Sequence, residues 1–255
     1  MLAAVIVLTG FVSAAEPGDL GVTLEATYLS RFIFRGLDYF PNNHSAFRPS
    51  VNVDLWGTGF GMNVAWTHAN SGGFENLQRM DYSIFYQNKM WEGESYQTNY
   101  ELGYVYYNHP DNPSYLRDFM EVYGSFAWPR LLPCNLVPSY TAISTWESDG
   151  DQANVRSGMA GWVHVFGLGY NWTVPGFTPG TTEQVFHFTA DAVYNDGAYA
   201  PTVDNDWSHA VFGVSTAFDV TDNVKFTPGV YYQSSWEDTV NTSDEYWTSL
   251  SLSYA

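Results

Sequence analysis

Charged residues are scarce in this chain. They make up 14% of its 255 residues, against about 25% in a typical soluble domain. A soluble protein of this size normally carries more Lys and Glu on its surface. Aromatic residues reach 18%, and there are 22 Gly. This composition argues against an ordinary soluble fold and favours short β-strands whose outer surface does not face water.

Basic residues and cysteine are also scarce. The chain has 9 Lys and Arg against 27 Asp and Glu, for a formal net charge of -18. Nucleic acid is therefore disfavoured as a partner, because its binding needs a basic footprint. The single cysteine, Cys134, has no partner for an internal disulfide. We expect it to be a small apolar residue in a turn, since no His or basic cluster lies near it in sequence.

A long hydrophobic run is also missing. No window beyond the N-terminus offers the roughly 20 apolar residues of a membrane helix. Residues 1–15, MLAAVIVLTGFVSAA, combine an apolar stretch with small residues at its end. This pattern predicts a signal peptide, although no basic residue follows Met1. The alternative, a buried N-terminal strand, is disfavoured by the polar break at residues 16–19. The predicted mature domain is residues 16–255.

The sequence does contain a repeated alternation of apolar and polar residues. In the cleanest segment Phe47, Val51 and Val53 fall on one face, whereas Arg48 and Asn52 fall on the other. Such period-two segments separated by turns are typical of transmembrane barrels. The first predicted strand starts at residue 22, and the others lie near 47–55, 60–67, 79–87, 96–104, 117–128, 135–146, 158–171, 184–195, 207–218, 224–236 and 246–254. We therefore predict an all-β, transmembrane, antiparallel up-and-down β-barrel of about 12 strands.

The connections between these segments alternate in length. One set is mostly short, as at residues 57–59, and the other, which includes residues 36–46, is longer and more polar. Short periplasmic turns and long outer loops are the outer-membrane pattern, and an even strand count returns both termini to the periplasm. Aromatic residues near strand ends predict two interfacial girdles. One comprises Trp56, Trp91, Trp128, Trp172 and Phe226, and the other Trp66, Trp146, Tyr194, Trp207 and Trp236.

The C-terminal segment carries its own signal. Tyr246, Leu250, Leu252 and Tyr254 share one face of the last strand. The segment resembles the C-terminal strand that outer-membrane proteins present to the barrel-assembly machinery, although Ala255 follows the last aromatic residue. The expected location is the bacterial outer membrane. The expected partners are its lipid and lipopolysaccharide and that machinery, with a homo-oligomer left open.

The N-terminal third resembles a known family. The stretch Tyr28-Leu29-Ser30-Arg31-Phe32-Ile33-Phe34-Arg35-Gly36, continued by residues 45–54, is similar to the Gcw-chp or TorF-like group of outer-membrane proteins. The resemblance implies a barrel with a "YxFRG" first strand and a second strand that runs into a Gly-rich turn. Phe32 stands at the Tyr position of that motif. Because the role of the group is undefined, the resemblance implies no function.

Because successive side chains of a strand point to opposite faces, the position of a charged residue along its strand predicts whether it faces the lumen. The predicted channel-lining residues are Glu25, Arg31 and Arg35 on the first strand, and Arg48, Asp54, Arg79, Asp81, Glu101 and Glu121 on later strands. They could form a charged constriction that selects small polar solutes, or a salt-bridged plug that fills a narrow barrel. Eight strands leave a filled interior and sixteen an aqueous channel. Twelve strands lie between these cases, so both interpretations stay open.

The predicted function is a narrow porin-like channel for passive diffusion of small polar or cationic solutes, without cofactor or metal. A second hypothesis is a structural barrel whose loops bind a partner, a surface polymer or another copy through Tyr39, Phe40, Tyr115 and Tyr199. A third is a secreted β-sandwich that binds sugars through its Trp residues. Loop carboxylates such as Asp149 with Asp151, or Asp204 with Asp206, could bind Ca²⁺, but neither spacing completes an EF-hand, and solvated charge is the simpler interpretation.

One segment raises the question of catalysis. His187, Thr189 and Asp191 share a strand face, in a faint resemblance to the His-x-Ser element of outer-membrane lipid A deacylases. Thr stands where that element has Ser, and no oxyanion hole can be assigned. We therefore predict that the protein is not an enzyme, and that His187 belongs to a polar network in the lumen.

Overall fold

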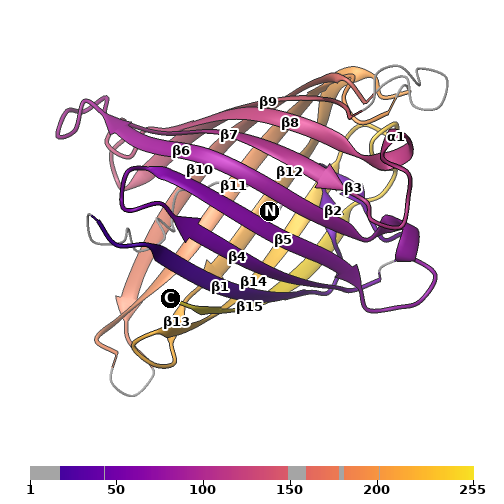
Figure 1. Ribbon diagram of the computed structural model, residues 1–255. Coiled ribbons are helices and arrows are strands. Elements are labelled where there is room, and N and C mark those ends of the chain that lie inside the picture. The colour runs from indigo at the N-terminus through magenta and orange to yellow at the C-terminus, as the bar shows by residue number, and fades with distance from the viewer. Residues whose placement is uncertain (1–17, 43, 149–158, 178–180, 201) are drawn as a thin grey trace.

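The computed structural model describes residues 18–42, 44–148, 159–177, 181–200 and 202–255, so the predicted signal peptide lies outside the described residues. One antiparallel sheet of thirteen strands dominates the described part (Figure 1). Twelve of them form the wall: β1 (Gly21–Leu29), β4 (Ala46–Asp54), β5 (Phe60–Ala69), β6 (Arg79–Met90), β7 (Thr98–Asn108), β8 (Phe119–Ala127), β9 (Leu136–Glu147), β10 (Gly161–Pro175), β11 (Glu183–Asp196), β12 (Asn205–Thr216), β14 (Val224–Ser235) and β15 (Glu245–Tyr254).

The remaining elements are short. They are β13 (Phe218–Asp219), the 3-10 helix η1 (Glu75–Leu77), the helix α1 (Ser114–Arg117), and a separate two-stranded sheet of β2 (Ile33–Phe34) and β3 (Leu37–Asp38). No helix among the described residues is long and apolar enough to cross a membrane.

The sheet closes on itself. The first wall strand pairs with the last, from Leu24 with Tyr254 to Leu29 with Ser249, and every other wall strand pairs with its neighbours in chain order. Closure removes the free edges that would leave backbone groups unpaired in lipid. The predicted twelve-stranded barrel is thereby confirmed, and the sandwich hypothesis is wrong. Pro138 and Pro228, which have no backbone N–H to donate, lie within β9 and β14, and both strands are continuous.

The two ends of the barrel differ. The N-terminal end of β1 and the C-terminal end of β15 lie at the same end of the barrel as the turn between β4 and β5. We call this end of the barrel the turn end. There, Trp56 (φ 60°) and Gly57 (φ 66°) form a tight hairpin turn in which two successive positive φ angles match the strand twist. The opposite end, where β1 ends at Leu29, is called the loop end. It carries η1 and α1.

Side chains alternate between the two faces of the wall. On β6, Tyr82 and Ile84 point outward and are 42% and 56% exposed, whereas Arg79 and Asp81 point inward and are 0% and 4% exposed. An apolar outer face with charged residues inside is the pattern of a lipid-embedded barrel. The predicted girdle residues lie on this outer face. The half-exposed ones include Trp56, Trp91 and Trp172 at the turn end, and Trp66, Trp207 and Trp236 at the loop end.

The connection between β1 and β4 differs from the prediction. We expected Arg31 and Arg35 to lie on the first strand, followed by an outer loop, but β1 ends at Leu29. The chain then turns inward and forms the β2–β3 hairpin, with Arg35 (φ 52°) and Gly36 (φ 89°) at its tip. We call residues 32–40 the inner hairpin. Its Phe32-Ile33-Phe34 run is apolar at three successive positions, and all three side chains are buried, which no half-exposed strand allows.

Candidate functional site: the barrel lumen

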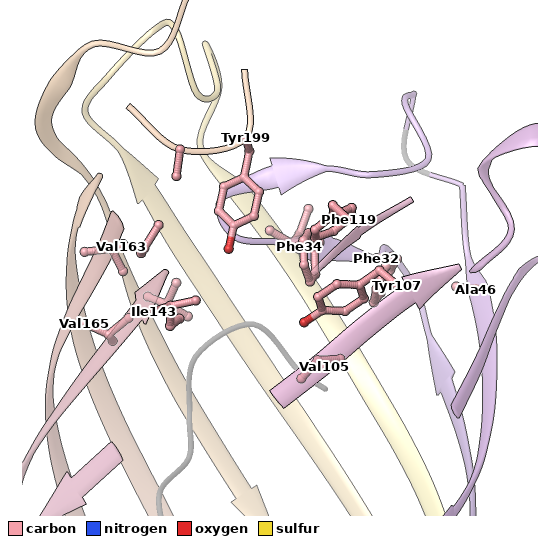
Figure 2. Close-up of a cluster of buried hydrophobic side chains, with 14 of the residues drawn as sticks. Phe32, Phe34, Ala46, Val105, Tyr107, Phe119, Ile143, Val163, Val165 and Tyr199 are labelled. Carbon is pink, nitrogen blue, oxygen red and sulfur yellow. The ribbon is translucent and has the colours of Figure 1, made fainter. Parts of the chain in front are cut away.

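Packed aromatic side chains occupy the lumen at the loop end (Figure 2). Phe34 of the inner hairpin contacts Tyr107 and Phe119 of the wall and Tyr199 of the β11–β12 connection, with ring centroids 5.6–6.2 Å apart. Phe40 is completely buried. We call this group the inner cluster. It includes Phe32, Phe34, Phe40, Val105, Tyr107, Phe119, Ile143, Val163, Val165 and Tyr199. The described residues thus constrict the lumen at this end.

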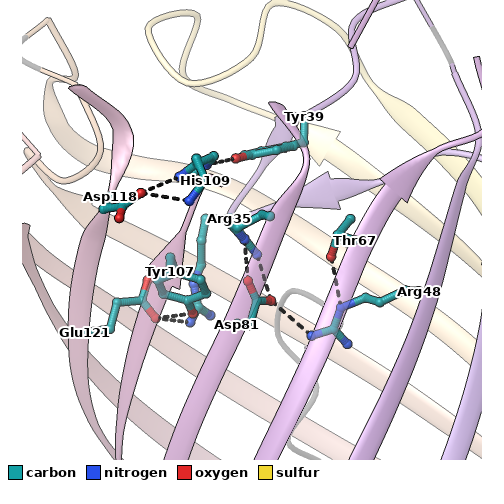
Figure 3. A network of polar contacts seen from close by, with 10 residues as sticks. Arg35, Tyr39, Arg48, Thr67, Asp81, Tyr107, His109, Asp118 and Glu121 are labelled. Carbon is teal, nitrogen blue, oxygen red and sulfur yellow. Dashed lines mark hydrogen bonds and ion pairs between the residues drawn. The ribbon is translucent and has the colours of Figure 1, made fainter. Parts of the chain in front are cut away.

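A buried arginine lies within the inner cluster. The guanidinium carbon of Arg79 is 4.1 Å from the ring centroid of Phe34 and 4.4 Å from that of Tyr107, within the range of cation–π attraction. Its charge is balanced by Asp81, which accepts hydrogen bonds from Nε at 2.6 Å and Nη2 at 3.2 Å. Asp81 also accepts a bond from Arg48 Nη2 at 3.1 Å (Figure 3).

A second buried carboxylate, Glu121, joins three segments of the chain. It accepts hydrogen bonds from Arg35 Nη2 of the inner hairpin (2.9 Å), from the hydroxyl of Tyr107 on β7 (2.7 Å), and from the hydroxyl of Tyr199. Burial, together with the Glu121 carboxylate, raises the pKa of Tyr199 well above its ordinary value, so its hydroxyl stays protonated and donates. Charge-assisted bonds of this kind are about twice as strong as neutral ones.

Four further contacts hold the hairpin region to the wall strands and their connections. The carbonyl of Gly36 accepts bonds from Gln233 Nε2 (2.8 Å) and Asn241 Nδ2 (3.0 Å). Arg31 forms an ion pair with Glu245. The Tyr39 hydroxyl shares a hydrogen bond of 2.6 Å with His109 Nε2. The hairpin is therefore docked on opposite sides of the lumen.

Beyond the inner cluster, the described residues line a cavity of about 300 Å³. It extends from Asp81 and Tyr107 toward Asp54 and Gln87, near the turn end. Most of the residues that line it carry polar or charged groups; they are Thr23, Glu25, Arg48, Ser50, Asn52, Asp54, Asn63, Asp81, Ser83, Phe85, Gln87, Glu101, Val105, Tyr107 and Tyr123.

The cavity has an excess of negative charge. It holds four carboxylates and one arginine, and Arg48 is paired with Asp81. The other three carboxylates, those of Glu25, Asp54 and Glu101, take part in none of the ion pairs among the described residues. Glu101 accepts a hydrogen bond from the Tyr123 hydroxyl at 2.6 Å, and Asp54 accepts one from the amide of Gly57 at 2.6 Å. These neutral donors hold the carboxylates in place without cancelling their charge.

The predicted lumen residues thus fall into two groups. Five of them line the cavity: Glu25, Arg48, Asp54, Asp81 and Glu101. Arg35, Arg79 and Glu121 are buried at the inner cluster, and Arg31 lies beside it with Glu245. The strand parity inferred for β4, β6, β7 and β8 agrees with the structure, whereas Arg31 and Arg35 lie beyond the first strand. Sequence reasoning missed Tyr107 and Gln233 as anchors of the inner hairpin.

Two loop hypotheses change with the structure. Phe40 and Tyr199, expected on outer loops that bind a partner, are 0% and 8% exposed, so their assignment to a binding surface is wrong. The side chain of Tyr115 lies outside the described part, as do Asp149 and Asp151. Among the described residues, no group of three or more His, Cys, Asp or Glu is arranged to hold a metal ion.

His187, Thr189 and Asp191, the segment considered for catalysis, lie on the lumen face of β11. His187 Nδ1 is hydrogen-bonded to Asn171 Oδ1 at 2.6 Å. Within the described chain, neither the Thr189 hydroxyl nor Asp191 Oδ2 has a hydrogen-bond partner. The three side chains therefore do not form the nucleophile–base contact that a hydrolase needs.

A closed barrel of twelve strands with an apolar exterior and a charged lumen defines a transmembrane β-barrel. No family model matches the chain, and no curated protein matches its sequence. Its fold is similar to that of the NanC porin, at 12% identity over 92% of this chain and 100% of that chain, with a TM-score of 0.54. It is also similar to the KdgM porin in complex with disordered oligogalacturonate, at 9% identity over 91% of this chain and 98% of that chain, with a TM-score of 0.52.

These comparisons concern the fold. At such low identity they show that the chain has the barrel architecture of outer-membrane porins. Membership of the Gcw-chp group stays a prediction.

Proposed function

We propose that this protein is a narrow porin-like channel of the bacterial outer membrane, through which small polar or cationic solutes diffuse passively. The observation that carries the proposal is the charged cavity inside a sealed barrel. Burying charged side chains is costly unless they are paired or solvated. Carboxylates without ionic partners along the lumen therefore favour a water-filled interior. The fold shared with two porins supports the same function.

The charge of the cavity supports a preference for cations. Glu25, Asp54 and Glu101 give it uncompensated negative charge, and the whole chain has a formal charge of -18. Rings of Asp and Glu favour cations in channels, and a low-dielectric wall strengthens the field inside a pore. Small cations and neutral polar solutes are the proposed cargo, and small anions are disfavoured.

The inner cluster supports a low conductance. The inner hairpin, Tyr107, Phe119 and Tyr199 fill the loop end of the lumen with packed side chains. A twelve-stranded barrel without such a filling would leave more room than an eight-stranded one, whose interior is just filled by wall side chains. The inner hairpin, more than the strand count, therefore sets the width of the path.

We propose that the turn end faces the periplasm and the loop end faces outward. Outer-membrane barrels keep short turns on the periplasmic side. The start of β1 and the end of β15 would then lie on that side as well. Lipid and lipopolysaccharide would contact the apolar outer face. The last strand exposes Tyr246, Leu250, Leu252 and Tyr254, which suits recognition by the barrel-assembly machinery. A homo-oligomer is compatible with this placement.

Transport is favoured over catalysis and over adhesion. The His187 segment lacks a nucleophile–base contact in the described residues. Two of the aromatic residues expected to bind a partner, Phe40 and Tyr199, are buried. Efflux from liposomes tests the proposal. Refolded protein should release small amines and small sugars faster than small anions of similar size. Release no faster than from empty liposomes would contradict a channel.

A further inference from the structure

The β1–β4 connection is much longer than its geometry requires. The two strands pair to their last residues, Leu29 with Ala46, so a two-residue turn could join them. The chain instead uses residues 30–45, which is 16 residues (45 − 30 + 1). Most of this segment is the inner hairpin inside the lumen. Its length therefore serves the interior of the barrel and not the joining of two strands.

The inner hairpin is held by docking and not by its own strands. Its two strands have two residues each and only two paired positions, Ile33 with Asp38 and Phe34 with Leu37. A hairpin this short has no independent stability in water. Its order depends on the inner cluster and on discrete polar contacts, chiefly Arg35 with Glu121 and the Gly36 carbonyl with Gln233. Such an element can undock as a unit while the wall stays closed.

The docked interface mixes two opposing preferences. Phe32, Phe34 and Phe40 are fully apolar and favour the docked state. Buried charges such as Glu121 and Arg79 lie at the same interface, and they would regain hydration if the hairpin left. Burying an ion pair carries a desolvation cost that its mutual attraction only partly offsets. An element whose docked and undocked states are each favoured by different groups can exist in two states.

We propose that the inner hairpin is a gate, and that the bond from Arg35 to Glu121 is the latch that holds it closed, with the Tyr199 hydroxyl keeping the Glu121 carboxylate in position. This inference rests on the proposed channel function and concerns its regulation. In the closed state the hairpin fills the loop end above the acidic cavity. In the open state it leaves the lumen at the loop end, and the path widens to the bore set by the wall strands.

Single-channel recording of three variants tests the gate. In the first, residues 31–44 are replaced by Asn-Gly, which joins β1 to β4 directly. In the second, Glu121→Gln weakens the latch, and in the third Tyr199→Phe removes one donor. The matched control shortens the exposed β6–β7 turn by deleting residues 92–95. Heat-modifiable mobility on gels selects folded barrels before recording.

The wild type should switch between a small and a large conductance level, and the hairpin replacement should stay at the large level. Glu121→Gln should keep both levels but raise the ratio of open to closed time by roughly ten- to hundredfold, the value of a hydrogen bond to a charged group. Tyr199→Phe should shift this ratio in the same direction by less, and the control should match the wild type.

A hairpin replacement with wild-type conductance, or a Glu121→Gln ratio equal to that of the wild type, would overturn the gate and leave the channel intact. Silence of every folded variant would instead overturn the channel itself.

Discussion

Arg79 and Asp81, two residues apart on β6, point to the same side of the wall and form a bidentate ion pair inside the barrel. The guanidinium donates through Nε and Nη2 to the two carboxylate oxygens, and its carbon, Cζ, lies 4.1 Å from the Phe34 ring centroid. Asp81 also accepts from Arg48 in the cavity wall. A single carboxylate therefore connects the inner cluster with the cavity.

Replacing Arg79 should destabilise the barrel strongly. Arg79→Met leaves the buried Asp81 with Arg48 alone, and breaking a buried pair from one side typically costs about 3–5 kcal/mol. Arg79→Lys should recover only part of this loss, because an ammonium cannot donate through a planar fork. Urea unfolding in detergent, followed by gel mobility, measures the difference.

The matched control for that change is Arg130→Met. Arg130 is exposed in the β8–β9 connection and donates to the carbonyl of Gly93. Its loss should change the free energy of unfolding by no more than about 0.5 kcal/mol. Equal effects of the two substitutions would show that the Arg79 pair has no special role.

Neutralising the cavity carboxylates should weaken cation selectivity. A unit charge about 8 Å from a passing ion contributes about 0.5 kcal/mol in a water-like dielectric, favourable for a cation and unfavourable for an anion, so the permeability ratio changes by about 1 kcal/mol, or roughly sixfold. Glu25→Gln and Glu101→Gln should each lower the cation-to-anion ratio by about this factor. Glu92→Gln, exposed on the β6–β7 turn, is the control. Reversal potentials in a salt gradient provide the readout, and unchanged ratios in both cavity variants would exclude the cavity from the ion path.

A lysine on the outer face of the wall should be costly. Ile84 lies in the middle of β6, between Met62 and Tyr104 in the register, and its side chain points outward. Ile84→Lys should cost about 2–4 kcal/mol at the bilayer midplane. Ser83→Lys, one residue earlier and facing the cavity, should cost less than about 1 kcal/mol. Unfolding from lipid vesicles compares them, and a reversed order would mean that the two faces are assigned the wrong way round.

Gly103 makes room for the ring that positions Glu101. A Cβ at this position would lie 2.5 Å from the Tyr123 ring and hydroxyl, so Gly103→Ala must displace the tyrosine that donates to Glu101. Overpacking of this kind costs about 1–3 kcal/mol. Gly72→Ala has only ordinary contact, 3.8 Å from Glu75, and should be neutral. Thermal unfolding of the two variants measures the difference. A Gly103→Ala variant as stable as Gly72→Ala would contradict the close packing of Gly103 against Tyr123.

The architecture could be predicted because the period-two pattern and the alternation of turns are local. Residues 79–87 show which side chains face inward without any knowledge of their neighbours, and the structure agrees. The inner hairpin could not be predicted in this way. Arg31 and Arg35 fit the parity of a longer first strand, and only the unbroken apolar run Phe32-Ile33-Phe34 departs from it.

The partners of Glu121 were equally hidden. Its three donors lie 14, 78 and 86 residues away in the chain, and two of them belong to connections whose path depends on the packed interior. A parity argument places Glu121 in the lumen but does not show what reaches it. The cavity residues were easier to predict because each lies within a regular strand.

The proposed channel requires a continuous aqueous path through the barrel, and single-channel current across a planar bilayer measures this path directly. Protein shown to be folded by its heat-modifiable mobility should produce discrete conductance steps, with a reversal potential that indicates cation preference. A bilayer that contains the folded protein and stays electrically silent over the whole voltage range would contradict the account.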